Sequence, residues 1–118
     1  MTHPTSDDPH VVRGRQEGRE AFEIHVDDSG EPAGFTQFVD HEGPNGERAR
    51  IFPHTFVDEK FSGQGLASAL VRRALDKSIE EGFTIVAVCP YVRTWIRRHP
   101  AYEEFSTAPA PEHLQALD

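Results

Sequence analysis

The sequence predicts a single α+β domain, in which two main helices pack on a mixed, mostly antiparallel sheet. Short apolar or alternating runs bounded by turn residues are typical of strands. One longer segment repeats apolar residues at the spacing of a helix face. A glycine-spaced turn joins a strand to this helix and another apolar strand follows, which indicates a right-handed strand–helix–strand crossover. The 118 residues are enough for one hydrophobic core.

The composition and the charge of the chain narrow the classes of protein to which it can belong. The formal net charge of −8 argues against a general nucleic-acid-binding protein, which would carry a basic face. The sequence shows no apolar run of membrane-spanning length and no signal-peptide pattern, so we expect a cytoplasmic protein without a membrane partner. The single Cys89 cannot form an internal disulfide, as is usual in a reducing compartment. The seven histidines are scattered, so we expect no metal site, and we expect a monomer or a weak homodimer.

The first half of the chain is expected to form strands joined by turns. Residues 1–15 are expected to be a loose N-terminal segment, in which Val11 and Val12 can start a short strand. Two turn-rich stretches then separate three extended runs, and the first of these alternates apolar and polar residues as a half-buried strand does. The expected strands cover residues 22–26, 35–39 and 50–57, with turns at 27–32 and 41–47.

Pro53 lies inside the third extended run and makes it irregular. Proline has no N–H group and cannot donate a hydrogen bond to a neighbouring strand. We therefore expect regular pairing to be lost near Pro53 and His54.

The clearest element is a helix over residues 66–81, with its apolar residues on one stripe and its charged residues opposite. Gly82 is expected to cap its C-terminus. Residues 84–89 form a buried strand rich in β-branched residues, and residues 91–99 form a short helix between two prolines. The expected organisation is a loose segment (1–15), a main domain (16–105) and an acidic C-terminal tail (106–118).

The turn before the long helix has the chemistry of an anion site. Gly63 and Gly65 permit a close approach of the backbone. The first N–H groups of the helix have no partners within it, and together with the helix dipole they suit a phosphate. A tight strand-to-helix turn without a ligand also needs such glycines. The stretch lacks the Gly-Lys-Ser/Thr ending of a nucleotide P-loop and the glycine spacing of a dinucleotide fingerprint.

Four motifs carry a resemblance to a known superfamily: His54-Thr55-x-Val57, Phe61-Ser62-Gly63-Gln64-Gly65-Leu66-Ala67, Cys89-Pro90-Tyr91-Val92 and Arg98-His99-Pro100-x-Tyr102. In their order and spacing the chain resembles the GNAT superfamily of N-acetyltransferases, and in particular its small stand-alone members, over about residues 22–102. The resemblance implies a minimal GNAT-like domain whose central strands splay apart. It also implies the transfer of an acetyl group from acetyl-CoA (coenzyme A) to an amine acceptor, for which a protein or peptide amine is one candidate.

The resemblance implies that the glycine turn binds the pyrophosphate of coenzyme A through backbone N–H groups. The pantetheine arm would enter the gap between the splayed strands and pair like an added strand. The residues expected to bind the cofactor are Thr55, Val57, Ser62, Gly63, Gln64, Gly65, Leu66, Ala67, Ser68, Tyr91, Arg93 and Arg97.

Arg93 and Arg97 lie four residues apart on one helix face, which suits the 3′-phosphate of coenzyme A. A solvated helix face, with Arg97 or Arg98 paired to Glu103 or Glu104, is the alternative.

His54 and Cys89 are the candidate catalytic residues, because each ends one of the two strands that flank the gap. An amine must be neutral to attack, and a lysine amine has a pKa near ~10.4, so His54 is a candidate base; a structural histidine beside Thr55 is the alternative. Cys89 is either an acyl acceptor in a two-step route or a small buried hydrophobic residue. Tyr91 is the nearest candidate for a general acid.

A second function stays open at this point. Ser62 and Phe56 stand where the superfamily usually has other side chains, which favours a non-catalytic module that binds acyl-CoA or coenzyme A. The short turn at residues 28–30 leaves no room for the helices that build the acceptor pocket in larger members. The acceptor side is therefore expected to be open, as suits an amine on a protein or peptide.

Overall fold

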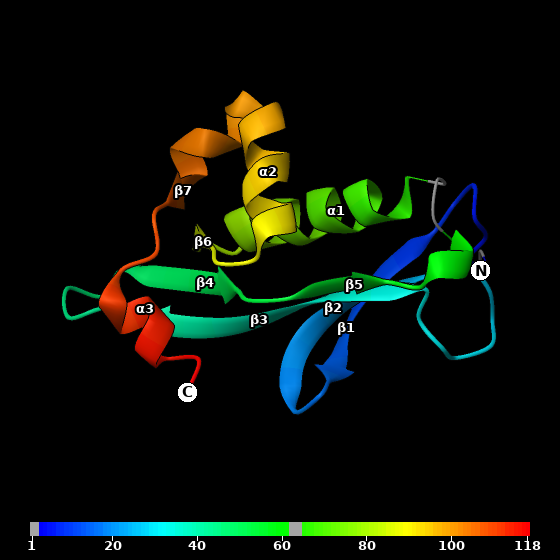
Figure 1. Cartoon of the computed structure of the whole chain (residues 1–118), viewed down its shortest axis with the longest axis horizontal. Helices are drawn as coiled ribbons and strands as arrows, with labels where there is room; N and C mark the ends of the chain where they lie inside the picture. The colour runs from blue at the N-terminus through cyan, green and yellow to red at the C-terminus, as the bar shows by residue number, and fades with distance from the viewer. Residues whose placement is uncertain (1–2, 62–64) are drawn as a thin grey trace.

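The computed structural model describes residues 3–61 and 65–118, and the statements below concern these residues. Their strands form one sheet in the order β1-β2-β3-β4-β6-β7, with β5 paired to β3 off this path. Figure 1 shows α1 and α2 on one side of the sheet and α3 on the other. The strands are β1 (His10–Gln16), β2 (Arg19–His25), β3 (Gly34–Glu42), β4 (Arg48–Phe52), β5 (Thr55–Val57), β6 (Thr84–Ala87) and β7 (Ser106–Thr107). The helices are α1 (Leu66–Glu80), α2 (Pro90–Arg98) and α3 (Pro111–Gln115), with 3-10 turns η1 (Glu59–Phe61) and η2 (Pro100–Phe105).

The sheet is mixed and mostly antiparallel, and this prediction is confirmed. β1 pairs with β2, β2 pairs with β3, and both β4 and β5 pair with β3, all antiparallel. β6 pairs in parallel with β4 on one side and with β7 on the other. The connection from β4 to β6 runs through α1, which is the crossover unit expected from the sequence.

The expectation of a loose N-terminal segment is wrong for residues 10–15. These residues belong to β1, which pairs with β2 along its whole length. The two strands are joined by Glu17 and Gly18, whose φ angles are 54° and 84°. Two-residue hairpin turns of type I′ need positive φ at both positions and usually contain Asn-Gly or Asp-Gly. The pair Glu-Gly is a weaker signal, so the sequence did not predict this turn.

Residues 106–118 are more than a peripheral tail. Ser106 and Thr107 form β7 and pair with β6. After α3, Ala116 and Leu117 pack against apolar side chains of β4 and β6, on the face of the sheet away from α1. β7 has two residues and α3 has five, so neither shows a periodic pattern that a sequence can reveal.

The main hydrophobic core lies between the sheet and α1. The helix buries Leu66, Leu70, Val71, Ala74, Leu75 and Ser78. The prediction that Gly82 ends this helix is confirmed: Glu81 is the C-cap residue, and Gly82 follows it at the C′ position with a φ of 88°. A glycine in this left-handed conformation satisfies the last helix carbonyls, since its N–H donates to the Ile79 carbonyl.

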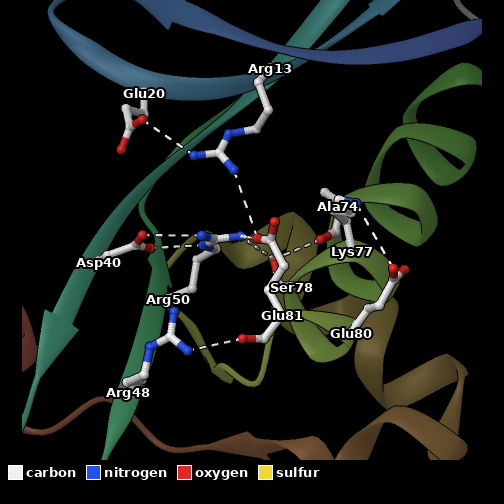
Figure 2. Close-up of polar contacts among 10 residues, drawn as sticks. All are labelled: Arg13, Glu20, Asp40, Arg48, Arg50, Ala74, Lys77, Ser78, Glu80 and Glu81. Atoms are coloured by element: carbon white, nitrogen blue, oxygen red, sulfur yellow. Dashed lines mark hydrogen bonds and ion pairs between the residues drawn. The ribbon is translucent and has the colours of Figure 1, made fainter.

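A buried arginine holds the C-terminal end of α1 against the sheet (Figure 2). Arg50 in β4 is 2% exposed and donates to both carboxylate oxygens of Asp40, at 2.7 and 3.1 Å. It also donates to Glu81 at 2.8 Å and to the Ser78 hydroxyl at 3.3 Å. Burial alone would lower the pKa of Arg50, but the hydrogen bonds to Asp40 and Glu81 outweigh it and raise the pKa. The guanidinium therefore stays charged and joins β3, β4 and α1.

Candidate functional site

The two central strands separate at Pro53. β4 and β6 pair in parallel as far as Phe52 opposite Ala87. The Phe52 carbonyl then accepts hydrogen bonds from the N–H groups of Val88, at 3.1 Å, and Cys89, at 2.8 Å. Beyond this point β5 continues beside β3, whereas the chain after β6 enters α2. The loss of regular pairing predicted at Pro53 is confirmed. It leaves a gap in the backbone pairing between β5 and the start of α2, and the Cys89 thiol bridges this gap to the Thr55 hydroxyl at 3.5 Å.

The start of α1 is an uncapped helix N-terminus within the described residues. Gly65 is the N-cap residue, with a φ of 72°, and no side chain caps this end among the residues that the structure describes. The first turn of the helix carries the N–H groups of Leu66, Ala67 and Ser68. Leu66 is 2% exposed, so it can offer its backbone but not its side chain to a ligand. The other residues predicted to bind the cofactor in this turn, Ser62, Gly63 and Gln64, lie outside the described residues.

A narrow cleft lies between the first turn of α1 and one face of α2. Its volume is about 150 Å³, and its lining is Ser68 of α1 with Tyr91, Thr94, Trp95, Arg98 and His99 of α2. The Trp95 Nε1–H donates to the Ser68 hydroxyl at 2.8 Å, which joins the two helices. The lining residues of α2 recur every three or four positions and therefore share one helix face. Arg98 brings a positive charge beside the positive end of the α1 dipole, and this combination suits an anionic group.

The structure places Arg93 and Arg97 away from this cleft. They lie on another face of α2 and line, with Ile96 and residues 106–109, a cleft of about 480 Å³ beside β7. Arg98, which the sequence analysis assigned only to a solvated ion pair, is the arginine that shares a cleft with Ser68. The sequence holds part of this signal, because Arg98 follows Tyr91 by seven residues and so lies on the same helix face, but it does not show that this face points toward α1.

Cys89 lies on the α1 side of the sheet, beside Thr55. Its thiol donates to the Thr55 hydroxyl at 3.5 Å, and that hydroxyl lies 2.9 Å from the hydroxyl of Thr36. Cys89 is 5% exposed and belongs to the main core, against which Val57 also packs. Thr55 and Val57, both predicted to bind the cofactor, therefore lie on the same side of the sheet as Cys89.

His54 lies on the opposite side of the sheet. It directly precedes Thr55, and neighbouring residues in an extended strand point to opposite faces. Its exposed ring packs edge-on against Phe35, with 5.9 Å between the ring centroids. Together with Gln37, residues 17–19 and residues 116–118 it lines an open pocket of about 680 Å³. The structure thus places the two candidate catalytic residues on different faces instead of side by side.

Tyr91 follows Cys89 by two residues and lines the cleft with Arg98. Burial raises the pKa of the Tyr91 hydroxyl above its ordinary value, Arg98 acts in the opposite direction, and the neighbouring Cys89 adds to the increase. The phenol is therefore protonated at neutral pH and can donate a hydrogen bond or a proton.

Gln37, Trp95 and Glu17 belong to the surroundings of the site and were not predicted from the sequence. Their contacts join residues that are distant in the chain: the Gln37 amide donates to the Glu17 carboxylate, and the Trp95 indole N–H donates to the Ser68 hydroxyl. A local sequence pattern could not reveal such contacts. Within residues 3–61 and 65–118, no three His, Cys, Asp or Glu side chains lie where they could hold a metal ion. No helix in the same ranges combines the length and the apolar character needed to cross a membrane.

The comparison with known families agrees with this geometry. Residues 21–105 match the family model described as GCN5-related N-acetyl-transferase. The chain belongs to this family. The recognition of a small GNAT-like domain from four sequence motifs is thereby confirmed. Among known proteins, this GNAT member is similar to protein NATD1 of Gallus gallus, with 30% identity over 70 residues that cover 59% of this chain and 58% of NATD1.

Two solved structures share the GNAT fold of this chain. The ribosomal-protein-alanine N-acetyltransferase of Brucella melitensis biovar Abortus 2308 is 29% identical, with a TM-score of 0.54, over 80% of this chain and 66% of that one. A GCN5-like protein of Staphylococcus aureus is 18% identical, with a TM-score of 0.60, over 88% and 93% of the two chains; at this identity the likeness shows the fold alone. The chain thus spans less than two thirds of NATD1 and of the Brucella enzyme.

Proposed function

We propose that this protein transfers an acetyl group from acetyl-CoA to an amine acceptor. The observation that carries the proposal is the divergence of β5 from the end of β6 beyond Phe52, on the side of the sheet that α1 and α2 cover. Diverging strands leave backbone edges to which an extended ligand can add. Membership of the GCN5-related family supplies the class of reaction.

The α1 and α2 side of the sheet suits acetyl-CoA. The first N–H groups of α1, after Gly65, would bind the pyrophosphate, and Arg98 is the arginine placed to meet a phosphate group. The cleft between the helices leads from Ser68 to Tyr91, two residues after Cys89. The thioester would then lie near Thr55 and Cys89, where β5 and the start of α2 no longer share backbone hydrogen bonds.

The reaction needs one proton removed from the amine and one supplied to the leaving group. The amine nitrogen forms a bond to the thioester carbonyl carbon, and the carbon–sulfur bond breaks. His54, on the opposite face, would take the amine proton directly or through a water molecule. Tyr91, on the cofactor side, would donate a proton to the departing thiolate, and proton transfer from His54 to Tyr91 through solvent would restore both groups.

Direct transfer agrees better with the position of Cys89 than a two-step route does. The thiol is buried and donates to Thr55, while the candidate base His54 faces the other side of the sheet. We expect no acetyl group on Cys89 when the intact protein is mixed with acetyl-CoA without an acceptor and weighed by mass spectrometry. An acetylated Cys89 that passes its acetyl group to an added amine would overturn the direct route.

The acceptor side is open, which favours an acceptor larger than a small enclosed metabolite. The pocket of about 680 Å³ beside His54 lies on the face that α1 and α2 leave uncovered. The similar Brucella protein is named for an alanine of a ribosomal protein, and an amine on a protein or peptide is a compatible acceptor here.

Two measurements test the proposed function. Calorimetric titration with acetyl-CoA should show binding, and thiol release should increase when a panel of primary amines is added. Binding without release for any amine would instead support a non-catalytic acyl-CoA-binding module. A failure to bind acetyl-CoA would overturn both functions.

The variant Gly65→Glu tests whether the start of α1 is the pyrophosphate site. A carboxylate at this position should weaken acetyl-CoA binding about tenfold or more, because it repels the diphosphate from the helix N-terminus. Gly65→Ala is the matched control, since it brings the same strain at positive φ without the charge, and no atom of the described residues lies within 4 Å of an added Cβ. Equal affinities for the two variants would argue against this site.

A further inference from the structure

We propose that Glu17 in the β1–β2 turn selects the acceptor, by binding a second positive charge on it. The inference rests on the proposed function and names an acceptor class for it. The acceptor would be a primary amine that also carries an ammonium group, as in a diamine or a lysine-containing peptide.

The β1–β2 turn forms one wall of the pocket beside His54. Glu17, Gly18 and Arg19 line it together with Gln37 of β3 and with residues 116–118. The pocket lies on the face opposite Cys89 and Thr55, so a molecule bound there would approach the strand gap from the side away from the α1–α2 cleft. Any group fixed in this wall can therefore contact an acceptor without disturbing the cofactor.

Glu17 is held in place by a buried side chain. Its φ of 54° is a left-handed conformation that glutamate rarely adopts, because its long side chain does not stabilise it locally. The Gln37 amide, which is 3% exposed, donates to the Glu17 carboxylate at 3.4 Å and to the Gln16 carbonyl at 3.2 Å. The buried amide thus anchors the backbone of the turn and contacts the exposed Glu17 carboxylate at the outer limit of hydrogen-bond distance.

The wall contains two carboxylates and one arginine, and this arginine donates to neutral carbonyl groups. Arg19 donates to the Gln37 side-chain carbonyl at 3.3 Å and to the Leu117 carbonyl at 2.7 Å. Glu17 and Asp118 contribute carboxylates to the pocket lining, and the chain carries a net charge of −8. This charge distribution attracts a cation and disfavours an anionic acceptor.

The Glu17 carboxylate suits a second ammonium group of the acceptor better than it suits the amine that is to be acetylated. A carboxylate within about 4–6 Å of an ammonium group stabilises the charged form, which cannot attack. Gln37 contacts both parts of the pocket wall: its backbone N–H donates to the His54 carbonyl at 2.8 Å, and its side-chain amide donates to the Glu17 carboxylate at 3.4 Å. Glu17 and His54 line the same pocket, so one acceptor with two amino groups can face both of them.

The test compares 1,4-diaminobutane with n-butylamine as acceptors, with thiol release as the signal. The wild-type protein should show a higher kcat/KM for the diamine, and Glu17→Gln should lower that value about three- to tenfold, mainly through KM. The value for n-butylamine and the affinity for acetyl-CoA should stay within about twofold. A peptide with a lysine next to its free N-terminus, compared with its norleucine analogue, shows whether a peptide is preferred to a free diamine. Glu31→Gln, in the exposed β2–β3 turn, is the control with the same change of net charge.

A binding measurement separates this inference from the proposed function. NMR titration of the acetyl-CoA-saturated protein with 1,4-diaminobutane should shift the signals of the turn and of His54, and Glu17→Gln should weaken this binding. If no amine is acetylated but the diamine still binds through Glu17, the proposed function fails and the charge-binding site stands. If amines are acetylated and the wild type and Glu17→Gln discriminate equally between diamine and monoamine, the inference is overturned. It is overturned as well if the diamine does not bind the acetyl-CoA-saturated protein.

Discussion

Replacing Arg50 by methionine tests whether the buried charge network positions α1. The guanidinium donates three hydrogen bonds to two carboxylates, at 2.7, 3.1 and 2.8 Å. It also lies 4.0 Å from the ring centroid of Phe83 and 4.4 Å from that of Phe38. Hydrogen bonds to charged groups contribute about 1.5–3 kcal/mol each, but Asp40 and Glu81 are 35% and 32% exposed and regain water when Arg50 is removed. Methionine keeps part of the packing, so we expect a loss of about 3 kcal/mol in the free energy of unfolding, as for a broken buried ion pair.

Urea denaturation followed by circular dichroism measures this loss directly. For a chain of this size about 3 kcal/mol corresponds to a fall in Tm of roughly 12 °C. Adding Asp40→Asn and Glu81→Gln to the methionine variant should recover part of the stability, since much of the cost comes from leaving two carboxylates unpaired. A loss below about 1 kcal/mol would refute the reasoning, because Arg50 would then contribute no more than a surface ion pair.

Three further predictions concern the cleft between α1 and α2 and the stability of the fold in acid. Arg98→Ala should raise the Kd for acetyl-CoA about tenfold, whereas Arg93→Ala, on the other face of α2, should leave it nearly unchanged; equal effects in calorimetry would contradict the placement of these side chains. Tyr91→Phe should lower kcat about 100-fold with little change in acetyl-CoA affinity, and an unchanged kcat would exclude it as the general acid. The hydrogen bond from Arg50 is the main cause of the lowered pKa of Glu81. Glu81 therefore stabilises the fold fully at pH values above the ordinary pKa of a glutamate. This stabilisation is lost as the pH falls through the lowered pKa of the folded state. Between about pH 5 and pH 3 the free energy of unfolding of the wild-type protein should therefore fall by more than that of Glu81→Gln. An equal fall for the two proteins, measured by urea denaturation at each pH, would contradict this.

The parts of the fold that were predicted correctly have strong local signals. The long helix has a continuous apolar stripe, and a single proline, Pro53, is enough to predict that a strand loses its pairing there. β1, β7 and α3 lack such signals. β1 depends on a turn of Glu17 and Gly18 that few sequences use, and the other two elements are too short to show a period. Their positions are decided by tertiary contacts, such as the packing of Ala116 and Leu117 on the sheet.

The candidate site was predicted as a set of residues, but its geometry was not. Counting four residues from Arg93 to Arg97 identified one shared face of α2, yet only the structure shows that the face toward α1 is the one with Tyr91 and Arg98. His54 and Cys89 both end strands at the gap, which suggested that they meet. The end of a strand gives a position along the sheet, whereas the direction of each side chain depends on the local pleat and on the pairing partners.

Pro53 explains how this sheet can place His54 and Cys89 on opposite faces. Because proline has no N–H, the ladder between β4 and β6 cannot continue through it, and β5 follows β3 instead. The Phe52 carbonyl accepts two hydrogen bonds at this point, so the chain diverges without leaving that acceptor unpaired. The next two residues then point to different sides: His54 to the open pocket, and Thr55 to Cys89 and the helices. Under the proposed function, the acyl donor and the amine would therefore meet through the gap, each recognised by its own face, and changes in the β1–β2 turn could alter the choice of acceptor without altering cofactor binding.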